Sequence, residues 1–379
     1  MSVFYEVRGA PVHSVLLMPT REVAVNFPKR DIALGFCGVC GFISNTRFDA
    51  SVHNYSGQYE ETQGFSPTFQ AFHKRLAASL IEKYDLHGKT VVEIGCGKGE
   101  FLTLLCEMGP NRGIGFDPAF VAERNPAGAG IEAEFIADFY SEKYTNVSAD
   151  FFCCKMTLEH IPNTAEFVGM VRRAIGDRPE SLVFFQIPDM HRVLRDVAFW
   201  DIYYEHCSYF TSPSLIWLFQ EAGFEVENVW TDYDDQYLMI TARPVQEKPK
   251  RNWFDPADVK KVAGDIDYFL TNQSALVEKW KGNIDEFSQQ KKRAVVWGSG
   301  SKGVAFLTAL QVNGAIEYVV DINPYRQGKF MAGTGQEIVS PEFLTTYRPD
   351  VAIAMNPIYQ PEIQADLSRM GLSTTVVAV

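Results

Sequence analysis

A glycine-rich segment at residues 91–101, VVEIGCGKGEF, constrains the fold of this chain more than any other feature. Its first residues have the apolar pattern of a buried strand, and three alternating glycines follow directly. Alternating glycines let the backbone turn sharply and let a ligand approach without meeting a Cβ atom. In open α/β sheets, ligands bind at the carboxyl ends of the strands. The segment therefore predicts a doubly wound α/β domain with a ligand at this loop.

Strand and helix patterns alternate on both sides of this segment. The further strand patterns are RGIGFD, EAEFIADF, ADFFCCKM and SLVFFQIP, and the helical patterns include GEFLTLLCEMG and AEFVGMVRRAI. This alternation predicts a mostly parallel sheet that is covered by helices on both faces. We expect the domain to span residues 71–245, after a small N-terminal module of short strands and turns at residues 1–70.

A second α/β unit is predicted at the end of the chain. Residues 246–290 begin with a charged, proline-bearing linker and continue with two helical stretches. AVVWGSGSKGV then starts a Rossmann-like unit, which we expect at residues 291–379. A chain of 379 residues is too long for one ordinary core, in agreement with this division.

Two acids follow the next strands at places where a nucleoside needs them. Asp117 ends the second strand, where its carboxylate is placed to accept hydrogen bonds from both ribose hydroxyls. Asp138 ends the third strand, where it is placed to meet an adenine amino group, with Phe139 or Ile136 against the ring. Glu93, inside the first strand, is expected to support the loop or to bind an ammonium group.

The spacing of the glycines distinguishes between cofactors. Gly95, Gly97 and Gly99 give G-x-G-x-G after a glutamate, which fits a compact sulfonium cofactor, whereas pyrophosphate binding favours G-x-G-x-x-G. We therefore expect S-adenosylmethionine at this loop. The alternative is a glycine-rich turn with a structural role only.

The second glycine motif has the dinucleotide spacing. Gly298, Gly300 and Gly303 spell G-x-G-x-x-G after a strand, and Asp321 ends the following strand. Because the chain already has one nucleotide site, we expect this motif, with Lys302 inside it, to bind the nucleotide part of the substrate. NAD binding and a purely structural turn remain open.

Charge and composition exclude several partners. A formal net charge of −12 argues against nucleic acid, although it permits an anionic small substrate in a local basic pocket. No apolar run approaches the roughly 18 residues that a membrane helix needs, and the first residues predict no signal peptide. Seven scattered cysteines are typical of reduced thiols, so we expect a cytoplasmic protein. The oligomeric state is open.

The segment DIYYEHCSYFTS, residues 201–212, contains the side chains that activation of a carbon requires. Methylation beside a ketone needs a base that removes a proton and a group that stabilises the enolate. Histidine has an unperturbed pKa of about 6.5, a tyrosine hydroxyl can donate to the enolate oxygen, and a carboxylate can set the histidine tautomer. We assign these roles to His206, Tyr203 and Glu205, with His160 as a second histidine.

Packing is the alternative interpretation for part of this segment. His206 and the neighbouring aromatic residues also suit a core position. For Glu159, beside His160, a solvated position on a helix is as consistent with the sequence as a functional role. Cys153 and Cys154 have the pattern of inert core residues.

These segments together resemble one enzyme family. DIYYEHCSYFTS, LEHIP at residues 158–162, and the C-terminal GSGSKGVAF and VVDINPYRQGKFMAGT resemble the sugar C-methyltransferases of deoxysugar biosynthesis. That family includes tetronitrose-type enzymes that act on dTDP-linked 4-keto sugars. The resemblance covers nearly the whole chain in the same order. It implies an N-terminal zinc module, a central methyltransferase domain, a C-terminal domain that holds the nucleotide sugar, and catalytic roles for Tyr203, Glu205, His206 and His160.

The chain departs from the family pattern at two places. The family usually has two CxxC pairs, whereas this chain has only the pair Cys37 and Cys40. A structural zinc ion is normally bound by four ligands. His13 or His53 is a candidate to complete a zinc site, and two ordinary reduced thiols are the alternative. Tyr204 stands where the family commonly has histidine, which makes it a candidate substrate contact and leaves the substrate's identity open.

The expected function follows from these motifs. We expect S-adenosylmethionine-dependent C-methylation beside the ketone of a nucleotide-linked keto-deoxysugar, in secondary metabolism such as antibiotic biosynthesis. The alternatives are O- or N-methylation of a small metabolite with the same cofactor, and an NAD(P)-dependent oxidoreductase that uses the second glycine motif.

Overall fold

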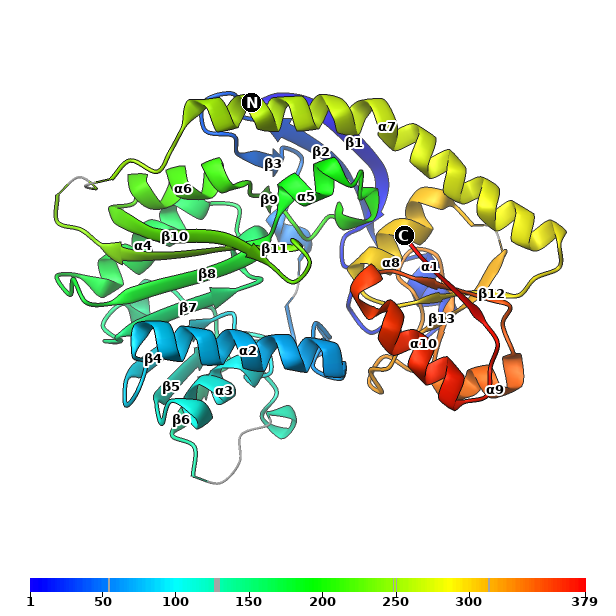
Figure 1. Ribbon diagram of the computed structural model, residues 1–379, viewed down its shortest axis with the longest axis horizontal. Coiled ribbons are helices and arrows are strands. Elements are labelled where there is room, and N and C mark those ends of the chain that lie inside the picture. The colour runs from blue at the N-terminus through cyan, green and yellow to red at the C-terminus, as the bar shows by residue number, and fades with distance from the viewer. Residues whose placement is uncertain (54, 126–129, 248, 250, 313) are drawn as a thin grey trace.

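The computed structural model describes residues 1–379 except 54, 126–129, 248, 250 and 313. The described chain forms three sheets of seven, five and four strands. The large central sheet and the C-terminal sheet stand side by side, and the N-terminal strands lie beside both (Figure 1). The two α/β domains therefore face each other.

The seven-stranded sheet has the order β10-β11-β8-β7-β4-β5-β6. Its strands are β4 (Thr90–Ile94), β5 (Arg112–Phe116), β6 (Ala133–Ile136), β7 (Phe151–Lys155), β8 (Leu182–Pro188), β10 (Phe224–Asp232) and β11 (Tyr237–Pro244). All neighbours pair in parallel except β11, which is antiparallel to both β8 and β10. The predicted doubly wound methyltransferase-type sheet is therefore confirmed.

Alternating side chains of the central strands enter two different cores. Helices α2 (Pro67–Tyr84) and α3 (Glu100–Met108) pack on the face that contains Phe151 and Cys153. Helices α4 (Thr164–Ile175) and α6 (Ser212–Glu221) pack on the face that contains Phe152 and Cys154. This alternation is the period of two that any strand imposes on its side chains. It also confirms both cysteines as buried core residues.

The five-stranded sheet belongs to the C-terminal domain and is parallel throughout. Its order is β14-β13-β12-β15-β16, with β12 (Ala294–Trp297), β13 (Ile316–Val320), β14 (Glu337–Val339), β15 (Val351–Ala354) and β16 (Thr375–Ala378). Its helices are α8 (Ser301–Leu310), α9 (Leu344–Tyr347) and α10 (Gln360–Arg369). In each α/β sheet the chain order reverses beside the first strand, between β4 and β7 and between β12 and β15. Ligands bind at such reversal points, so each domain presents one crevice.

The N-terminal sheet takes its last strand from a distant part of the chain. It consists of β1 (Ser2–Pro11), β2 (Lys29–Phe36), β3 (Ile43–Asn45) and β9 (Ser208–Tyr209), and α1 (Arg21–Val25) lies between its first two strands in the sequence. Because β9 directly follows the segment YYEH, the N-terminal module and that segment are built together. The sequence patterns did not indicate this pairing.

One long helix connects the two α/β domains. Helix α7 (Pro256–Gln289) has 34 residues and extends from the central domain to the C-terminal domain (Figure 1). Two helical stretches were expected here, but no proline interrupts the helix after its first turn, and the helix continues through Gly264 and Gly282. Its buried side is lined by Val259, Val262, Ile266, Phe269, Val277, Trp280 and Ile284. The expected linker before it falls partly outside the described residues.

Short helices complete the described elements. They are α5 (Met190–Arg195) and the 3₁₀ turns η1 (Ala50–Val52), η2 (Ala122–Arg124), η3 (Glu142–Tyr144), η4 (Leu158–His160), η5 (Phe199–Asp201), η6 (Pro341–Phe343) and η7 (Pro357–Tyr359). Within the described ranges, no helix has both the length and the apolarity that crossing a membrane requires.

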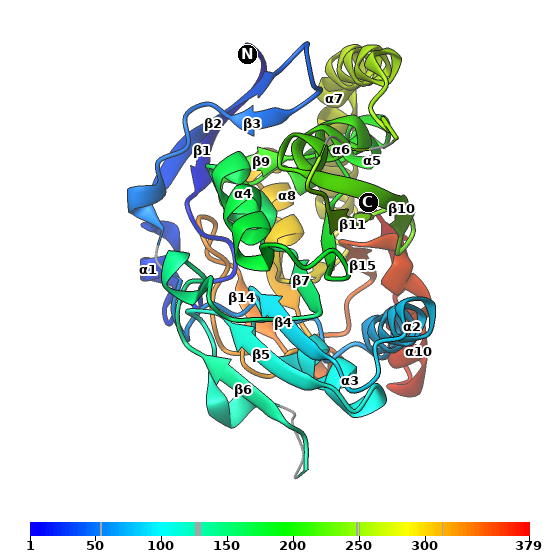
Figure 2. The same ribbon diagram turned by 90° about the vertical axis from the view of Figure 1, so that its left-hand side faces the viewer.

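Polar contacts join the domains across their cleft, and two carboxylates take part in them. Helices α2 and α10 lie beside each other (Figure 2), and the hydroxyls of Ser66 and Thr68 donate to Glu362 Oε2 at 2.7 and 2.6 Å. Elsewhere, Glu60 accepts hydrogen bonds from Arg124 of the central domain and, at 2.8 Å, from Asn323 of the C-terminal domain. Glu60 is only 1% exposed. Burial alone would raise its pKa, but these donors lower it below its usual value.

We predict that Glu60→Gln destabilises the protein, because it leaves Arg124 paired with a neutral group in a buried site. The free energy of unfolding, measured by urea titration, should fall by about 2–4 kcal/mol. The matched control is Glu132→Gln, whose partner Arg112 lies 3.4 Å away on the surface. That control should change the free energy by less than about 0.5 kcal/mol. Equal effects of the two variants would contradict the role of Glu60.

Candidate functional site

A cavity of about 550 Å³ lies at the carboxyl ends of β4, β5 and β7. The glycine loop forms its floor, and Gly95 and Gly97 have φ values of 72° and 56°, which disfavour other residues. A Cβ atom on Gly95 would lie 1.9 Å from the hydroxyl of Thr157. The loop therefore needs glycine for its conformation and for the space beside it.

The predicted ribose acid lies in this cavity. Asp117 Oδ2 accepts a hydrogen bond from the Gly97 amide at 2.8 Å, and Oδ1 accepts one from the Ala119 amide at 2.7 Å. Burial raises the pKa of Asp117, and these backbone donors oppose the shift. Each oxygen retains a further lone pair, so the carboxylate can hold the loop and accept from a ligand hydroxyl at the same time.

The predicted adenine residues lie at the rim of the same cavity. Asp138 pairs with Lys143 and accepts from the Tyr144 hydroxyl at 2.8 Å, and these contacts lower its pKa. Phe139 is 59% exposed and lies edge-on to Tyr55 at 6.4 Å. Ile136, the alternative contact for the ring, packs with the hydrophobic core instead.

Glu93 lies deeper in the cofactor cavity. It is 2% exposed, and its Oε2 has no hydrogen-bond partner among the described residues. Burial raises its pKa to about 7. A buried carboxylate oxygen without a donor suits an ammonium group, which is one of the two roles predicted for Glu93.

A second cavity of about 240 Å³ lies between the central and C-terminal domains. The five residues predicted to bind substrate from the second glycine motif all line it, namely Gly298, Gly300, Lys302, Gly303 and Asp321. Asp321 accepts hydrogen bonds from Ser299 and from the Asn323 amide, so it shapes the loop as Asp117 does in the central domain. Lys302 pairs with Asp201, which also accepts from Arg192 at 2.8 Å.

The two cavities meet at a small set of shared residues. These include Val15, Glu61, Met156, Tyr203 and Ser301. Tyr203 is half-buried, and burial raises the pKa of its hydroxyl well above the usual value. The hydroxyl therefore stays protonated as a hydrogen-bond donor at the boundary between the cavities.

Glu205 has a different partner from the one expected. It is 1% exposed and accepts hydrogen bonds from His13 Nδ1 and the Ser14 amide, both at 2.9 Å, and from the Ser14 hydroxyl. Burial alone would raise the pKa of Glu205, but these donors lower it. The carboxylate therefore orients His13 and not His206.

His160 has its tautomer set by a backbone group. Its Nδ1 lies 3.1 Å from the carbonyl oxygen of Glu205 and 3.1 Å from the Tyr55 hydroxyl. A carbonyl oxygen can only accept, so Nδ1 has the hydrogen and Nε2 has a free lone pair. Burial lowers the pKa of His160 to about 4, and the ring lines the cofactor cavity in its neutral form.

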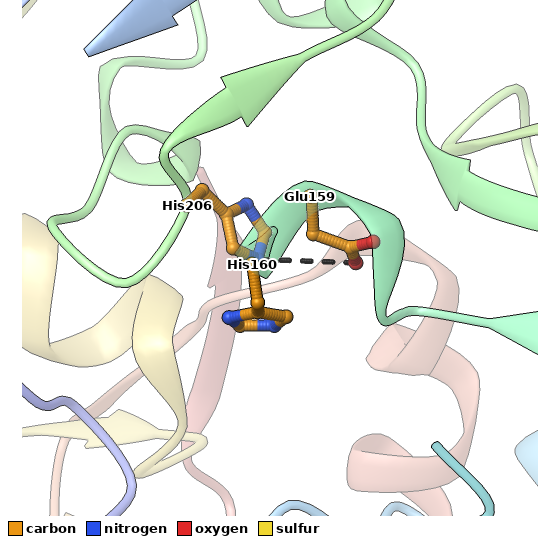
Figure 3. Close-up of side chains that lie close together, drawn as sticks. All are labelled: Glu159, His160 and His206. Atoms are coloured by element: carbon orange, nitrogen blue, oxygen red, sulfur yellow. Dashed lines mark ion pairs between the residues drawn. The ribbon is translucent and has the colours of Figure 1, made fainter. Parts of the chain in front are cut away.

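His206 and Glu159 lie beside His160 (Figure 3). The His206 ring is 4.8 Å from that of His160 and 4.2 Å from that of Tyr203. Glu159 Oε1 lies 4.0 Å from His206 Nε2, which is too long for a hydrogen bond and close enough for a charge interaction. Burial lowers the pKa of His206 well below its usual value and raises that of Glu159 to about 8.

The structure corrects the interpretation of Glu159 as a solvated residue. Its side chain is almost fully buried, and neither carboxylate oxygen has a hydrogen-bond partner in the described part of the chain. The ligand atoms of Glu159, His160 and His206 lie within 4.8 Å of one another, the one such group of metal-ligating side chains among the described residues. This set can transfer protons or hold a divalent cation.

The residues predicted for zinc do not assemble. Cys37 and Cys40 lie in the turn between β2 and β3, and no described histidine, acid or further cysteine joins them in a group of three. His13 instead contacts Glu205, and His53 Nε2 lies 2.8 Å from the carbonyl oxygen of Val12. The described residues therefore do not fit a site with four zinc ligands.

Tyr204 also requires a correction. Its side chain is fully buried, stacks on Phe48 and accepts a hydrogen bond from the Asp49 amide at 2.9 Å. It lines neither cavity, because alternation along the segment turns it towards the N-terminal sheet. The structure places Tyr204 in the core of the N-terminal module and not at a substrate.

Several residues of the site were not predicted for the contacts that the structure gives them. His13 and Ser14 follow β1, far from YYEH in the chain, and their contact depends on the N-terminal fold. Lys155 and Gln186 line the cofactor cavity from the ends of β7 and β8. A polar residue at the end of an otherwise apolar strand was the available signal for these two.

The comparisons with known proteins agree with this geometry. Residues 68–229 match a family model described as a methyltransferase domain, and residues 266–377 match one described as a C-methyltransferase C-terminal domain. The C-methyltransferase NovU of Streptomyces niveus is 28% identical over an alignment of 311 positions, and the match covers 76% of this chain and 72% of the relative. The C-terminal unit is thus of a type found in C-methyltransferases.

Solved structures show weaker similarity. A 1,6-didemethyltoxoflavin-N1-methyltransferase of Burkholderia thailandensis is 17% identical with a TM-score of 0.37, and the match covers 46% of this chain and 79% of that one. The magnesium protoporphyrin IX methyltransferase of Synechocystis PCC 6803 is 17% identical with a TM-score of 0.37, over 47% and 84% of the chains. The assignment depends on the family models and the curated relative and not on these structures.

We predict that Asp117→Ala weakens binding of S-adenosylhomocysteine by about 1.5–3 kcal/mol, because charge-assisted hydrogen bonds to the ribose are lost. Isothermal titration calorimetry measures this directly. The control is Asp150→Ala, an acid beside the opposite end of β7 that accepts from the Thr90 amide. Affinity in the control should not change. An unchanged affinity in Asp117→Ala would show that the ribose binds elsewhere.

Two independent observations now agree. The glycine loop and Asp117 form a cofactor cavity at the reversal point of a methyltransferase-type sheet. The family models match the central and C-terminal domains in that order. The chain is therefore an S-adenosylmethionine-dependent methyltransferase whose two matched domains are similar to those of C-methyltransferases.

Proposed function

We propose that this enzyme methylates a carbon beside the ketone of a nucleotide-linked keto-deoxysugar. The observation that supports this most is the position of Tyr203, at the boundary of the two cavities and 4.2 Å from His206, ring to ring. A substrate that fills the second cavity would present its sugar to this boundary. When bound, S-adenosylmethionine supplies the electrophilic methyl group.

The enzyme's own groups have to generate the carbon nucleophile. His206, which burial keeps neutral, removes the proton beside the ketone, and the electron pair of that C–H bond becomes the enolate. The Tyr203 hydroxyl donates to the enolate oxygen. The enolate carbon then accepts the methyl group, and the proton stays on the His206 ring until it is released to solvent.

Glu159 and His160 support this step in different ways. Ionised Glu159, 4.0 Å from His206 Nε2, stabilises the imidazolium that forms when the proton arrives. His160 keeps its Nδ1 hydrogen on the Glu205 carbonyl, so its Nε2 can accept a hydrogen bond from a sugar hydroxyl. Of the two histidines, we assign the base role to His206 because Glu159 Oε1 lies 4.0 Å from its Nε2.

The nucleotide part of the substrate belongs in the second cavity. Its glycine loop leads into α8, whose first residues have no side-chain cap, so backbone N–H groups remain available for a phosphate. Lys302 and Arg192 line the same cavity and add positive charge around Asp201. These features suit the diphosphate of a nucleotide sugar.

We predict that His206→Asn binds S-adenosylhomocysteine normally and loses turnover by about 100- to 10,000-fold, the usual cost of losing a general base. Exchange of the substrate's proton beside the ketone, followed by NMR in deuterated water, should fall by a similar factor. The control is His191→Asn. His191 lies in α5, pairs with Asp265 of α7, and lines neither cavity. In this control variant, the substrate's proton beside the ketone should exchange at the normal rate.

The outcomes separate the competing activities. Methylation without exchange in the unaltered enzyme would indicate O- or N-methylation. Normal exchange in His206→Asn, together with its loss in His160→Asn, would transfer the base role to His160. Loss of exchange on treatment with a chelator, with recovery on addition of a divalent cation, would show that Glu159, His160 and His206 hold a metal and would contradict the proposal.

The pH dependence of exchange follows from Glu159. Its pKa is raised to about 8 by burial, so its stabilising charge is present above that pH and absent below it. The facing groups do not titrate in this range, because His160 is neutral above about pH 4 and Tyr203 stays protonated. We predict that the exchange rate rises between pH 7 and 9, measured with substrate and S-adenosylhomocysteine at saturation. Glu159→Gln should remove this rise, and its persistence in that variant would contradict the role of Glu159.

A further inference from the structure

One acid at the boundary of the two cavities has no role in the proposed mechanism. Glu61 lines both cavities, as Tyr203 does. A methyl group can pass from the cofactor to the sugar only where the two ligands touch, and the proposed function places that point beside Tyr203. A side chain at this boundary therefore faces the sugar ring close to the carbon that is methylated.

Glu61 is incompletely paired within the protein. Its Oε1 is buried and has no hydrogen-bond partner among the described residues. Its Oε2 lies 3.3 Å from Lys98 Nζ, but that ammonium group makes shorter hydrogen bonds to the carbonyl oxygens of Ala119 and Tyr59, at 2.7 and 3.1 Å. The lysine therefore compensates the charge of Glu61 and leaves an acceptor oxygen unused, which a native site normally pairs with a ligand or water.

The surroundings of Glu61 hold it in place but leave it open to a ligand. A Cβ atom on Gly97 would lie 2.7 Å from Glu61 Oε1, so the carboxyl group packs directly against the backbone of the glycine loop. The Glu61 side chain is nevertheless 30% exposed. Because the last torsion of a glutamate side chain is soft, either oxygen can turn towards the cavities without a movement of the loop.

The donors of the cofactor have other acceptors. Asp117 is the acceptor expected for the ribose hydroxyls, and the unpaired oxygen of Glu93 suits the ammonium group. The sulfur atom that carries the methyl group has no N–H or O–H group of its own. The unused acceptor of Glu61 is therefore left for a donor on the substrate.

We propose that Glu61 accepts a hydrogen bond from a hydroxyl or amino substituent on the ring carbon beside the ketone, and thereby selects sugars that have such a substituent. This inference rests on the proposed function, which places a keto sugar at the boundary. A site with a buried acceptor rejects an analogue that lacks the donor, because the acceptor then stays unpaired. Glu61 is thus a specificity-determining residue.

The test compares three dTDP-linked 4-keto-6-deoxy sugars that have a hydroxyl group, an amino group or only hydrogen on carbon 3. Calorimetry in the presence of S-adenosylhomocysteine measures their affinities for the full chain. The unaltered enzyme should bind at least one donor-bearing sugar about 10- to 100-fold more tightly than the third sugar, the usual effect of one hydrogen bond to a charged group. Glu61→Ala should reduce this preference to less than about threefold, by weakening the donor-bearing sugars alone.

Two comparisons make the result specific to the substrate. Affinity for S-adenosylhomocysteine should change less than about twofold in Glu61→Ala, because the cofactor does not use this acceptor. Glu107→Ala, which removes an exposed acid of α3 outside both cavities, should retain the full preference.

A second variant identifies the substituent. Glu61→Gln removes the charge and keeps an acceptor oxygen, so a preference for the amino sugar should fall about 10-fold or more, and a preference for the hydroxyl sugar should fall less. If Glu61→Ala does not fold, Glu61→Met, which has a similar length and no oxygen acceptor, gives the same decision.

Each result bears on the inference. An unchanged preference in the folded variant, equal weakening of all three sugars, or a selective loss of S-adenosylhomocysteine would overturn it. Failure of the proposed function looks different, because the sugars would then bind with a preference that depends on Glu61 while neither proton exchange nor methylation follows. Methylation without any preference would contradict this inference alone, and binding of none of the three sugars would contradict both.

Discussion

The buried carboxylate of Glu205 is the interaction on which the arrangement of the whole site depends. A buried charge is tolerated only when donors surround it, and here the donors come from His13 and Ser14, just after β1. Ser14 in turn lies 2.7 Å, oxygen to oxygen, from Ser301 at the start of α8. The backbone carbonyl of Glu205 contacts His160. Glu205 thus ties the N-terminal module and the C-terminal domain to the YYEH segment.

The two α/β domains stabilise their glycine loops by the same kind of hydrogen bond. In each, an acid at the end of the second strand accepts hydrogen bonds from the glycine loop after the first strand, as Asp117 does for Gly97 and Asp321 for Ser299. The acid holds the loop open at the point where the strand order reverses. Since the two loops face each other across Tyr203, a cofactor in one and a substrate in the other would meet at that tyrosine.

Three carboxyl groups around the cofactor cavity, those of Glu61, Glu93 and Glu159, each have at least one buried oxygen without a hydrogen-bond partner among the described residues. Burial raises the pKa of Glu61 and Glu93 to about 7 and that of Glu159 to about 8. Such groups are costly in an empty site, because desolvation disfavours their charged forms. They become favourable when a cationic ligand or a protonated histidine arrives.

The sequence by itself determined the features that follow from local chain geometry. Alternating glycines after an apolar strand indicated the loop of Gly95 and Gly97, short apolar runs indicated the strands, and the ends of strands indicated Asp117 and Asp321. What the tertiary structure alone decided concerns partners and burial: Glu205 contacts His13, Tyr204 enters the core, Glu159 is buried, and α7 continues without a break. These facts depend on contacts between segments far apart in the chain. Residue spacing contains no information on such contacts, because they arise only when separate elements pack together.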